Sequence, residues 1–414
     1  MTSAITSDLI SFIALCPLPL VMKLGIGAGV SNALPAVTSL PLGPKCSDVV
    51  FSLNVTAINL VLPDAVVATA SAVIENGTLA QAQALIAAVG ETALLDIAIS
   101  GTYNISGRFC EPEVRIPGRE NHIQLLVHGA TYNKNYWSGG DFPIGFKGNQ
   151  YSWIAYASQR GYPTLSIDRL GSGNSSHPDP IATVQAATEV ECHYQIIEAL
   201  RNTRVVGGRK FSKIAYVGHS VGSVLGNYLA ATHPDAVDVM VLTGYSKYLP
   251  LSLAGILVTS VLAPAQLVAS RFDALPLGYF SMLSEAGRSG LFYSNNPHDF
   301  DTSVLEFDFA REGTLTLGEA VSILGTPVAS HFRGPILVIT GHLDQAFCGL
   351  GLPFLGELTC ATGKASQMEQ TRSLFPKANY SWVDVPHTGH GLNFHYSAQT
   401  TFKTVHDYLQ ETLF

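Results

Sequence analysis

The residue best placed to do chemistry is Ser220, within the pentapeptide Gly218-His219-Ser220-Val221-Gly222. The apolar run before it predicts a strand, and residues 223–233 after it predict a helix. A tight turn between a strand and a helix holds such a serine in strained geometry and presents its hydroxyl. Gly218 and Gly222 lack the Cβ atoms that would clash in this turn. G-x-S-x-G alone is a weak signal in a chain with 38 Gly, so the flanking elements carry the prediction of a nucleophilic serine.

A nucleophilic serine needs a base and an acid that orients it, and a serine in this strand-turn-helix motif is followed along the chain by the acid and then the histidine. Asp344 comes after the apolar run 336–340 and a short turn. A carboxylate at that strand end can accept the Nδ1 proton of a histidine and hold the correct tautomer. The alternative is an aspartate that only caps the local turn. We take Asp344 as the candidate acid.

The candidate base is His390, which lies between the last predicted strand, at 380–385, and the final predicted helix. A glycine on each side gives this loop the freedom to point the imidazole at the serine. His387, closer to the strand, and His395, at the start of the helix, are its rivals. A glycine-histidine pair after the last strand is the usual arrangement, which favours His390.

An oxyanion formed at the serine needs two backbone N–H donors. Val221 presents one at the start of the helix, where the helix dipole also favours negative charge. The other donor is expected in the loop after the buried strand 123–127. Gly129 lets this loop turn sharply, and Ala130 is expected to present the N–H. His128 is predicted to brace the loop rather than to act as a base.

The elements that must position these residues alternate between strands and helices. Such alternation predicts an α/β fold, with a mostly parallel central sheet and helices on both faces. The expected strands are 49–62, 94–103, 106–111, 123–127, 163–168, 214–217, 237–243, 335–340 and 380–385. The expected helices are 78–89, 151–159, 184–203 and 395–412.

The alternation breaks after the strand at 237–243, where a largely apolar stretch predicts a helical cap inserted after the sixth strand. We therefore expect three parts. Residues 1–45 form an apolar arm or weak signal segment, residues 246–334 form the cap, and residues 46–245 and 335–414 form the catalytic core.

From about Leu94 to Phe414 the chain resembles the α/β-hydrolase superfamily, through five motifs in the expected order. The fifth is the strand-end loop 167–175, similar to a D-x-x-G-x-G-x-S element of that superfamily. This loop has two glycines but lacks the third glycine and the following helix of a dinucleotide-binding loop, so it does not predict one. The stretches 101–110 and 127–132 resemble fungal hydrolases, many with secretion signals. That group includes thioesterases, lactonases, acyltransferases and lactone cyclases of secondary metabolism, such as vibralactone cyclase.

The resemblance implies an acyl-enzyme formed on Ser220 and released by water, with no metal or redox cofactor. Serine at the turn between this strand and helix argues against epoxide hydrolases and haloalkane dehalogenases, which place aspartate there. The apolar cap favours a lipophilic small-molecule ester, lactone or thioester. Two alternatives stay open. The same triad could pass the acyl group to a hydroxyl of the substrate, or the chain could be a silent binding module.

The composition of the chain limits the classes of partner that it could bind. Only 13% of the residues are charged and the net charge is -8, without a Lys/Arg cluster, so nucleic acid is not an expected partner. Pro17 and Pro19 exclude a straight membrane-spanning helix from the apolar start of the chain. The arm could instead pack on the body or on a second subunit, which leaves a homodimer as an expectation.

The signals for a cellular compartment conflict. Five N-x-S/T sequons, low charge and six cysteines favour secretion, with Cys348–Cys360 and Cys46–Cys110 as candidate disulfides. Free buried thiols are the alternative. No basic residue precedes the apolar segment, and Asp8 stands where a signal peptide carries positive charge. Both secretion and the cytoplasm therefore stay open.

Overall fold

The structure is a computed structural model. It describes residues 43–76, 81, 95–140, 147, 149–249, 262–348, 360–412 and 414. The arm expected at 1–45 lies almost wholly outside these residues, and so does the helix expected at 78–89. A helix that the sequence did not suggest, α1 (Asp64–Asn76), lies within them.

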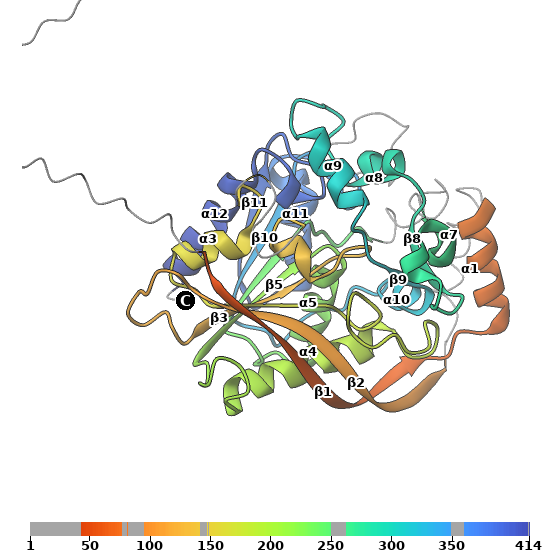
Figure 1. The fold of residues 1–414 in the computed structure, drawn as a ribbon, viewed down its shortest axis with the longest axis horizontal. Helices are drawn as coiled ribbons and strands as arrows, with labels where there is room; N and C mark the ends of the chain where they lie inside the picture. Colours follow the sequence, from red (N-terminus) through yellow and green to blue (C-terminus); the bar gives the residue numbers. More distant parts are fainter. Residues whose placement is uncertain are drawn as a thin grey trace, which may run out of the picture. The chain divides into compact units, whose positions relative to one another are not determined.

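An eight-stranded sheet forms the centre of the fold, in the order β1-β2-β4-β3-β5-β6-β10-β11 (Figure 1). The pairs β1–β2 and β2–β4 are antiparallel, and the other neighbours are parallel. This confirms the expected mostly parallel sheet. The strands are β1 (Lys45–Leu60), β2 (Asp96–Glu111), β3 (His122–Val127), β4 (Thr164–Ile167), β5 (Lys213–His219), β6 (Val239–Thr243), β10 (Pro335–Gly341) and β11 (Asn379–Val385).

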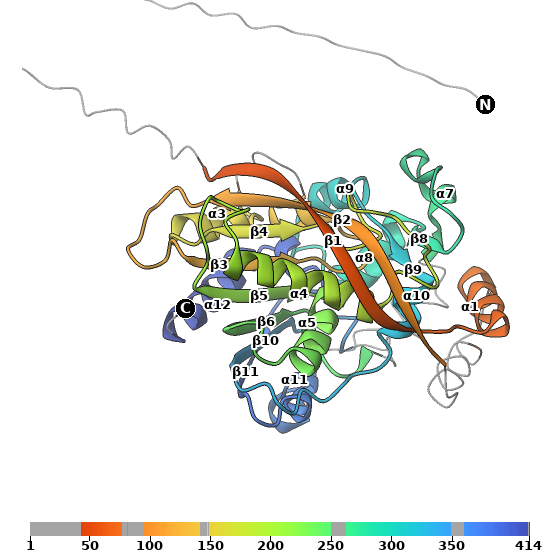
Figure 2. The same cartoon turned by 90° about the horizontal axis from the view of Figure 1, so that it is seen from below.

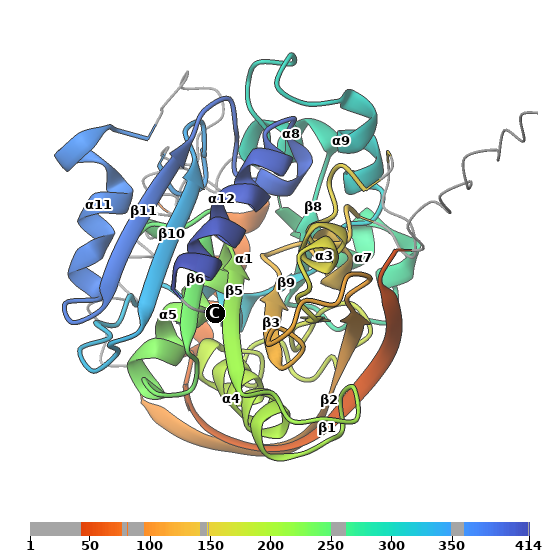
Figure 3. The same ribbon diagram turned by 90° about the vertical axis from the view of Figure 1, so that its left-hand side faces the viewer.

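Helices cover both faces of this sheet (Figures 2 and 3). α3 (Trp153–Gln159) and α12 (Ala398–Glu411) pack together on one face, and α4 (Ala186–Asn202) and α5 (Val221–Thr232) pack on the other. The middle strands, such as β3, are buried on both faces and are therefore apolar almost throughout. Shorter helical segments complete the core: η1 (Lys134–Trp137), η3 (Gly363–Ala365), α11 (Gln367–Thr371), η4 (Arg372–Leu374) and η5 (Leu392–Phe394).

Strands β1 and β2 form one long antiparallel ladder at the edge of the sheet, from Lys45↔Glu111 to Leu60↔Asp96. The two edge strands expected at 94–103 and 106–111 are therefore one strand. Alternate residues of β1 between 51 and 57 are buried and the intervening ones are exposed, as expected for a strand with one face on the core.

Two disulfides close within the described residues. Cys46 and Cys110 are direct partners in the β1–β2 ladder, and Cys348 bonds to Cys360 shortly after Asp344. Both candidate pairs are thus present, and the free-thiol alternative is wrong for these four cysteines. Cys192 is a buried free thiol.

The chain between β6 and β10 leaves the main sheet, and residues 262–334 of it are called the inserted segment below. The cap expected here to be helical also holds a small antiparallel sheet. Its strands are β7 (Leu262–Pro264), β8 (Tyr279–Met282) and β9 (Leu315–Thr316). Its helices are α7 (Ala265–Val268), η2 (Ser270–Phe272), α8 (Glu285–Phe292), α9 (Thr302–Phe309) and α10 (Leu317–Ser322).

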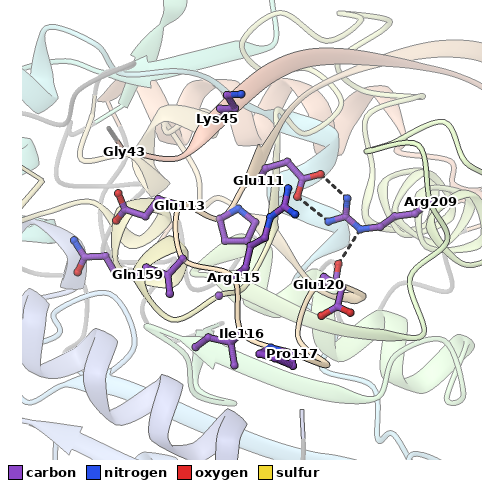
Figure 4. A pocket seen from close by; sticks show the side chains of 13 residues that line it. Gly43, Lys45, Glu111, Glu113, Arg115, Ile116, Pro117, Glu120, Gln159 and Arg209 are labelled. Carbon is purple, nitrogen blue, oxygen red and sulfur yellow. Dashed lines mark hydrogen bonds and ion pairs between the residues drawn. The ribbon is translucent and has the colours of Figure 1, made fainter. Parts of the chain in front are cut away.

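A pocket of about 1090 Å³ opens beside the ion pair of Glu111 and Arg209 (Figure 4). Much of its lining comes from the segments that lead into β3, β4 and β5, so it lies at the amino ends of the parallel strands. Ser220 follows the carboxyl end of β5, at the opposite edge of the sheet. This pocket is therefore separate from the candidate site. Among the described residues no helix has both the length and the apolarity to span a membrane.

Candidate active site

Ser220 occupies the turn between β5 and α5 with φ 55° and ψ -120°. This positive-φ conformation is costly for a residue other than glycine. The turn is tight on both sides. A Cβ on Gly218 would lie 2.5 Å from the backbone oxygen of Gly222, and one on Gly222 would lie 2.2 Å from that of Val127. Both glycines are therefore required by close packing. The serine is 6% exposed, at the amino end of α5.

His390 and Asp344 meet at the carboxyl ends of β10 and β11. The Nδ1–H of His390 donates to Oδ2 of Asp344 across 2.8 Å, and both side chains are fully buried. The other carboxylate oxygen accepts the backbone N–H of Phe347 at 2.8 Å. This pairing puts the lone pair of His390 on Nε2, which is buried and has no hydrogen-bond partner among the described residues. The base position is thus free to take a proton.

His390 also lies beside the serine turn. Its ring centroid is 4.8 Å from that of His219, the residue before Ser220. A Cβ on Gly244 would lie 3.0 Å from the Cε1 atoms of both histidines. The structure therefore brings the three candidate residues Ser220, His390 and Asp344 to one edge of the sheet.

The rival His387 points elsewhere. Its side chain is 77% exposed, and its Nδ1 lies 3.4 Å from Oδ1 of Asp299. No contact joins it to Asp344 or Ser220 among the described residues. The geometry supports His390 as the base over His387.

The second rival, His395, has both ring nitrogens occupied. Its Nε2 accepts the backbone N–H groups of Ser294 and Gly389, at 3.0 and 3.1 Å, and its Nδ1–H donates to the oxygen of Gly391 at 2.9 Å. Burial lowers the pKa of His395 to about 4, so the ring is neutral at pH 7. It holds the backbone on both sides of His390 and is not available as a base.

The loop that carries Gly129 and Ala130 lies beside the serine turn. A Cβ on Gly129 would lie 2.7 Å from the Cβ of Ser220, so this loop passes directly beside the serine. Among the described residues, neither the N–H of Ala130 nor that of Val221 donates a hydrogen bond in the loop contacts around them. These two donors stay candidates for the oxyanion hole, next to a serine that needs one.

His128 braces this loop. Its Nδ1–H donates to the oxygen of Gly129 at 2.8 Å, and its Nε2 accepts the backbone N–H of Arg169 at 3.1 Å. Burial, reinforced by the charge of Arg169, lowers the pKa of His128 well below its usual value. A neutral imidazole with both nitrogens bonded fits the predicted supporting role.

A family model described as the alpha/beta hydrolase family matches residues 124–402, well over half of the chain. The chain belongs to that family. The match spans the serine turn and the candidates Asp344 and His390 together. The expected fold and the expectation of an enzyme of the α/β-hydrolase class are therefore confirmed.

Several solved structures are similar to this α/β hydrolase at low identity. A thermophilic esterase from Thermogutta terrifontis has 14% identity and a TM-score of 0.49, over 75% of this chain and 95% of its own. An α/β-hydrolase-fold protein from Chitinophaga pinensis has 14% identity and a TM-score of 0.47, over 74% and 94%. A laboratory-evolved potato epoxide hydrolase has 13% identity and a TM-score of 0.45, over 75% of this chain and 96% of its own. No curated protein matches the chain.

Aromatic side chains surround the candidate base, His390. The rings of Phe292 and Phe347 lie 5.2 and 5.5 Å from that of His390, and the ring of Tyr136 stacks on His219 at 4.4 Å. Phe292 comes from α8 in the inserted segment, so the insertion forms part of the wall. A dry, apolar wall strengthens every electrostatic interaction within it.

The strand-end loop at Asp168 has a structural role. The carboxylate pairs with Lys134 across 2.6 Å in a buried ion pair and also accepts the backbone N–H of Asn174 at 3.0 Å. A Cβ on Gly173 would lie 2.3 Å from its carboxyl carbon. Asp168 therefore fixes this loop through an ion pair and a hydrogen bond.

Sequence reasoning missed the residues that support the base. His395 was weighed only as a rival, although its spacing of five residues from His390 is compatible with a ring that spans the loop. Phe292 carried no signal, because it lies in a segment about 100 residues before His390 whose position depends on the whole fold.

Proposed function

We propose that this α/β hydrolase cleaves an ester, lactone or thioester of a lipophilic small molecule through an acyl-enzyme on Ser220. One observation carries the proposal. The imidazole of His390 is held by Asp344 through Nδ1, whereas its buried Nε2 has no partner among the described residues. A buried imidazole with one nitrogen fixed on a carboxylate and the other free is the arrangement of a general base.

The first half of the reaction forms the acyl-enzyme. His390 takes the hydroxyl proton of Ser220 as the serine oxygen attacks the carbonyl carbon. The N–H groups of Val221 and Ala130 stabilise the resulting oxyanion. The carbonyl re-forms, the bond to the leaving group breaks, and His390 returns the proton to the departing alcohol or thiol.

The second half releases the acid. His390 takes a proton from water, whose oxygen attacks the acyl carbon, and the proton then passes to the oxygen of Ser220. Asp344 stabilises the imidazolium in both halves and keeps Nδ1 protonated. It does this from a fully buried position, where charge interactions are less screened than in water.

The apolar wall supports a lipophilic substrate. Phe292 and Phe347 pack on His390, so the acyl group of a bound ester would lie against rings rather than charges. A hydrophobic wall favours apolar groups in proportion to the area removed from water.

A second candidate keeps the triad and changes the acceptor. Ser220 is 6% exposed and His390 is fully buried, which limits the access of water to the acyl-enzyme. A hydroxyl of the substrate would then capture the acyl group and close a lactone. The resemblance to fungal hydrolases of secondary metabolism agrees with this outcome.

A fluorophosphonate probe, which reacts only with an activated serine, tests the nucleophile. We expect labelling of the wild type and none of Ser220→Ala or His390→Ala, with circular dichroism to confirm that the variants fold. Absence of labelling in a well-folded wild type would overturn the proposal and support a silent binding module.

A substrate panel separates hydrolysis from ring closure. Aryl esters, lactones and thioesters with short and long acyl chains are incubated with the enzyme, and the masses of the products are measured by mass spectrometry. A lactone that gains the mass of water, or an ester or thioester that yields the free acid, supports hydrolysis. A product from a hydroxy ester that loses only the leaving alcohol supports the cyclase.

A further inference from the structure

Thr131, the residue after the candidate donor Ala130, has a backbone conformation that its side chain disfavours. Its φ is 54°, in the left-handed region. A β-branched residue there is an outlier that persists only where its surroundings hold it. Thr131 directly follows Ala130 in this loop, so the bonds that fix Thr131 also restrict where the backbone of Ala130, and with it the N–H, can lie.

All three contacts that hold Thr131 come from the inserted segment. Its N–H donates to the oxygen of Thr314 at 3.2 Å, and its own oxygen accepts the N–H of Gly313 at 2.8 Å. Its hydroxyl accepts from Nη1 of Arg288 at 3.2 Å. Thr131 and these partners lie more than 150 residues apart in sequence, so the strain is imposed by tertiary structure.

Arg288 is itself fixed. It is fully buried on α8 and forms two bonds to Asp308 on α9, at 2.7 and 2.8 Å. Glu312 lies 3.6 Å from the same Nη1 atom, and the guanidinium lies 4.6 Å from the ring centroid of Tyr132. A planar guanidinium held in this way presents its remaining N–H groups in a defined direction.

We infer that Arg288 is a positioning residue, which acts through the hydroxyl of Thr131 to set the Ala130 N–H against the oxyanion. The inference rests on the proposed function of Ser220. It makes the inserted segment part of the catalytic machinery as well as a cover over it. A displaced donor weakens stabilisation of the transition state more than binding of the substrate.

The experiment compares Thr131→Val with Thr131→Ser on p-nitrophenyl butyrate. Valine matches threonine in shape and in β-branching but has no hydroxyl, and serine keeps the hydroxyl. We expect Thr131→Val to lower kcat about tenfold with KM within a factor of about two, and Thr131→Ser to stay near the wild type. An alkyl trifluoromethyl ketone, which forms an oxyanion on the serine, should bind Thr131→Val about tenfold more weakly.

A double-mutant cycle of Thr131→Val with Arg288→Lys tests whether Arg288 affects kcat through the hydroxyl of Thr131. Lysine keeps the buried positive charge beside Asp308 but cannot make the bidentate contact and reach Thr131 together. If the two residues act through one contact, the double variant will lose no more kcat than the worse single variant. Arg333→Lys, at an exposed arginine of the inserted segment, is the control and should leave kcat unchanged.

The outcomes separate this inference from the proposed function. A wild type that is neither labelled by fluorophosphonate nor active overturns both. A labelled, active wild type with Thr131→Val at wild-type kcat overturns the positioning role alone, as do additive effects of Thr131→Val and Arg288→Lys. Thermal unfolding of each variant is measured alongside, and Arg288→Lys carries the test if Thr131→Val is not folded.

Discussion

The Nε2 atom of His395 accepts a hydrogen bond from the backbone N–H of Ser294 across 3.0 Å. Because the same ring also bonds to Gly389 and Gly391, it links the inserted segment to the backbone on both sides of His390. We expect His395→Ala to lower kcat by about tenfold to a hundredfold, because the base loses its fixed position. Steady-state kinetics measure this, with the exposed His387→Ala as the control that should keep full activity. A large loss of kcat in His387→Ala with full activity in His395→Ala would assign the base to His387.

The triad itself gives the largest expected losses. Ser220→Ala and His390→Ala should each reduce kcat by about 10⁶-fold, since the members of a triad act as a unit. Asp344→Asn should cost about 10⁴-fold, because the amide favours the wrong tautomer of His390. Asp299→Asn, which changes the carboxylate beside His387, is the control. Substantial activity in His390→Ala would refute the assignment.

Acid should destabilise the fold through buried histidines. Burial lowers the pKa of His193 and His406 to about 3 and that of His395 to about 4, whereas an unfolded histidine has a pKa of about 6.5. Between these values the unfolded chain binds protons that the folded chain does not. The free energy of unfolding should therefore be highest above pH 6.5 and fall by about 1.4 kcal/mol per histidine for each pH unit below it.

Urea unfolding at pH 7, 6 and 5 measures this slope. His406→Gln removes one of the three groups and should lower the slope by about one proton, although it also costs stability at every pH. An unchanged slope in this variant would show that His406 does not titrate as the structure indicates.

The two disulfides should contribute unequally to stability. The Cys46–Cys110 bond joins residues separated by 64 positions and the Cys348–Cys360 bond joins residues separated by 12. Chain-entropy arguments give about 4 kcal/mol for the longer loop and about 3 kcal/mol for the shorter one. Unfolding of the Cys→Ser pairs measures both values. A larger loss for the shorter loop would indicate that local packing outweighs loop closure.

Local patterns were sufficient to predict the elements that carry the candidate residues. Ser220 lies between a strand and a helix that the sequence signals directly, and Asp344 and His390 follow strands whose apolar runs are unmistakable. Each of these residues depends mainly on its own strand end. The parallel sheet then brings the strand ends together, because the carboxyl ends of parallel strands share one edge.

Features that depend on distant segments were not predictable. Strand β2 continues through 104–105 because β1 pairs with it along its whole length, which overrides the local break in pattern. The strands β7, β8 and β9 span 3, 4 and 2 residues, too short for any periodicity to show. The conformation of Thr131 is set by residues more than 150 positions away. No window of the sequence holds that information.

The bond between Cys348 and Cys360 has a consequence for the acid of the triad. The backbone N–H of Cys348 donates to the oxygen of Asp344 at 3.0 Å, and the N–H of Cys360 donates to the oxygen of His342 at 2.8 Å. The disulfide therefore joins the two residues that bond to the backbone of the turn carrying Asp344. In a chain without this covalent link, backbone hydrogen bonds alone would tie these two residues to that turn.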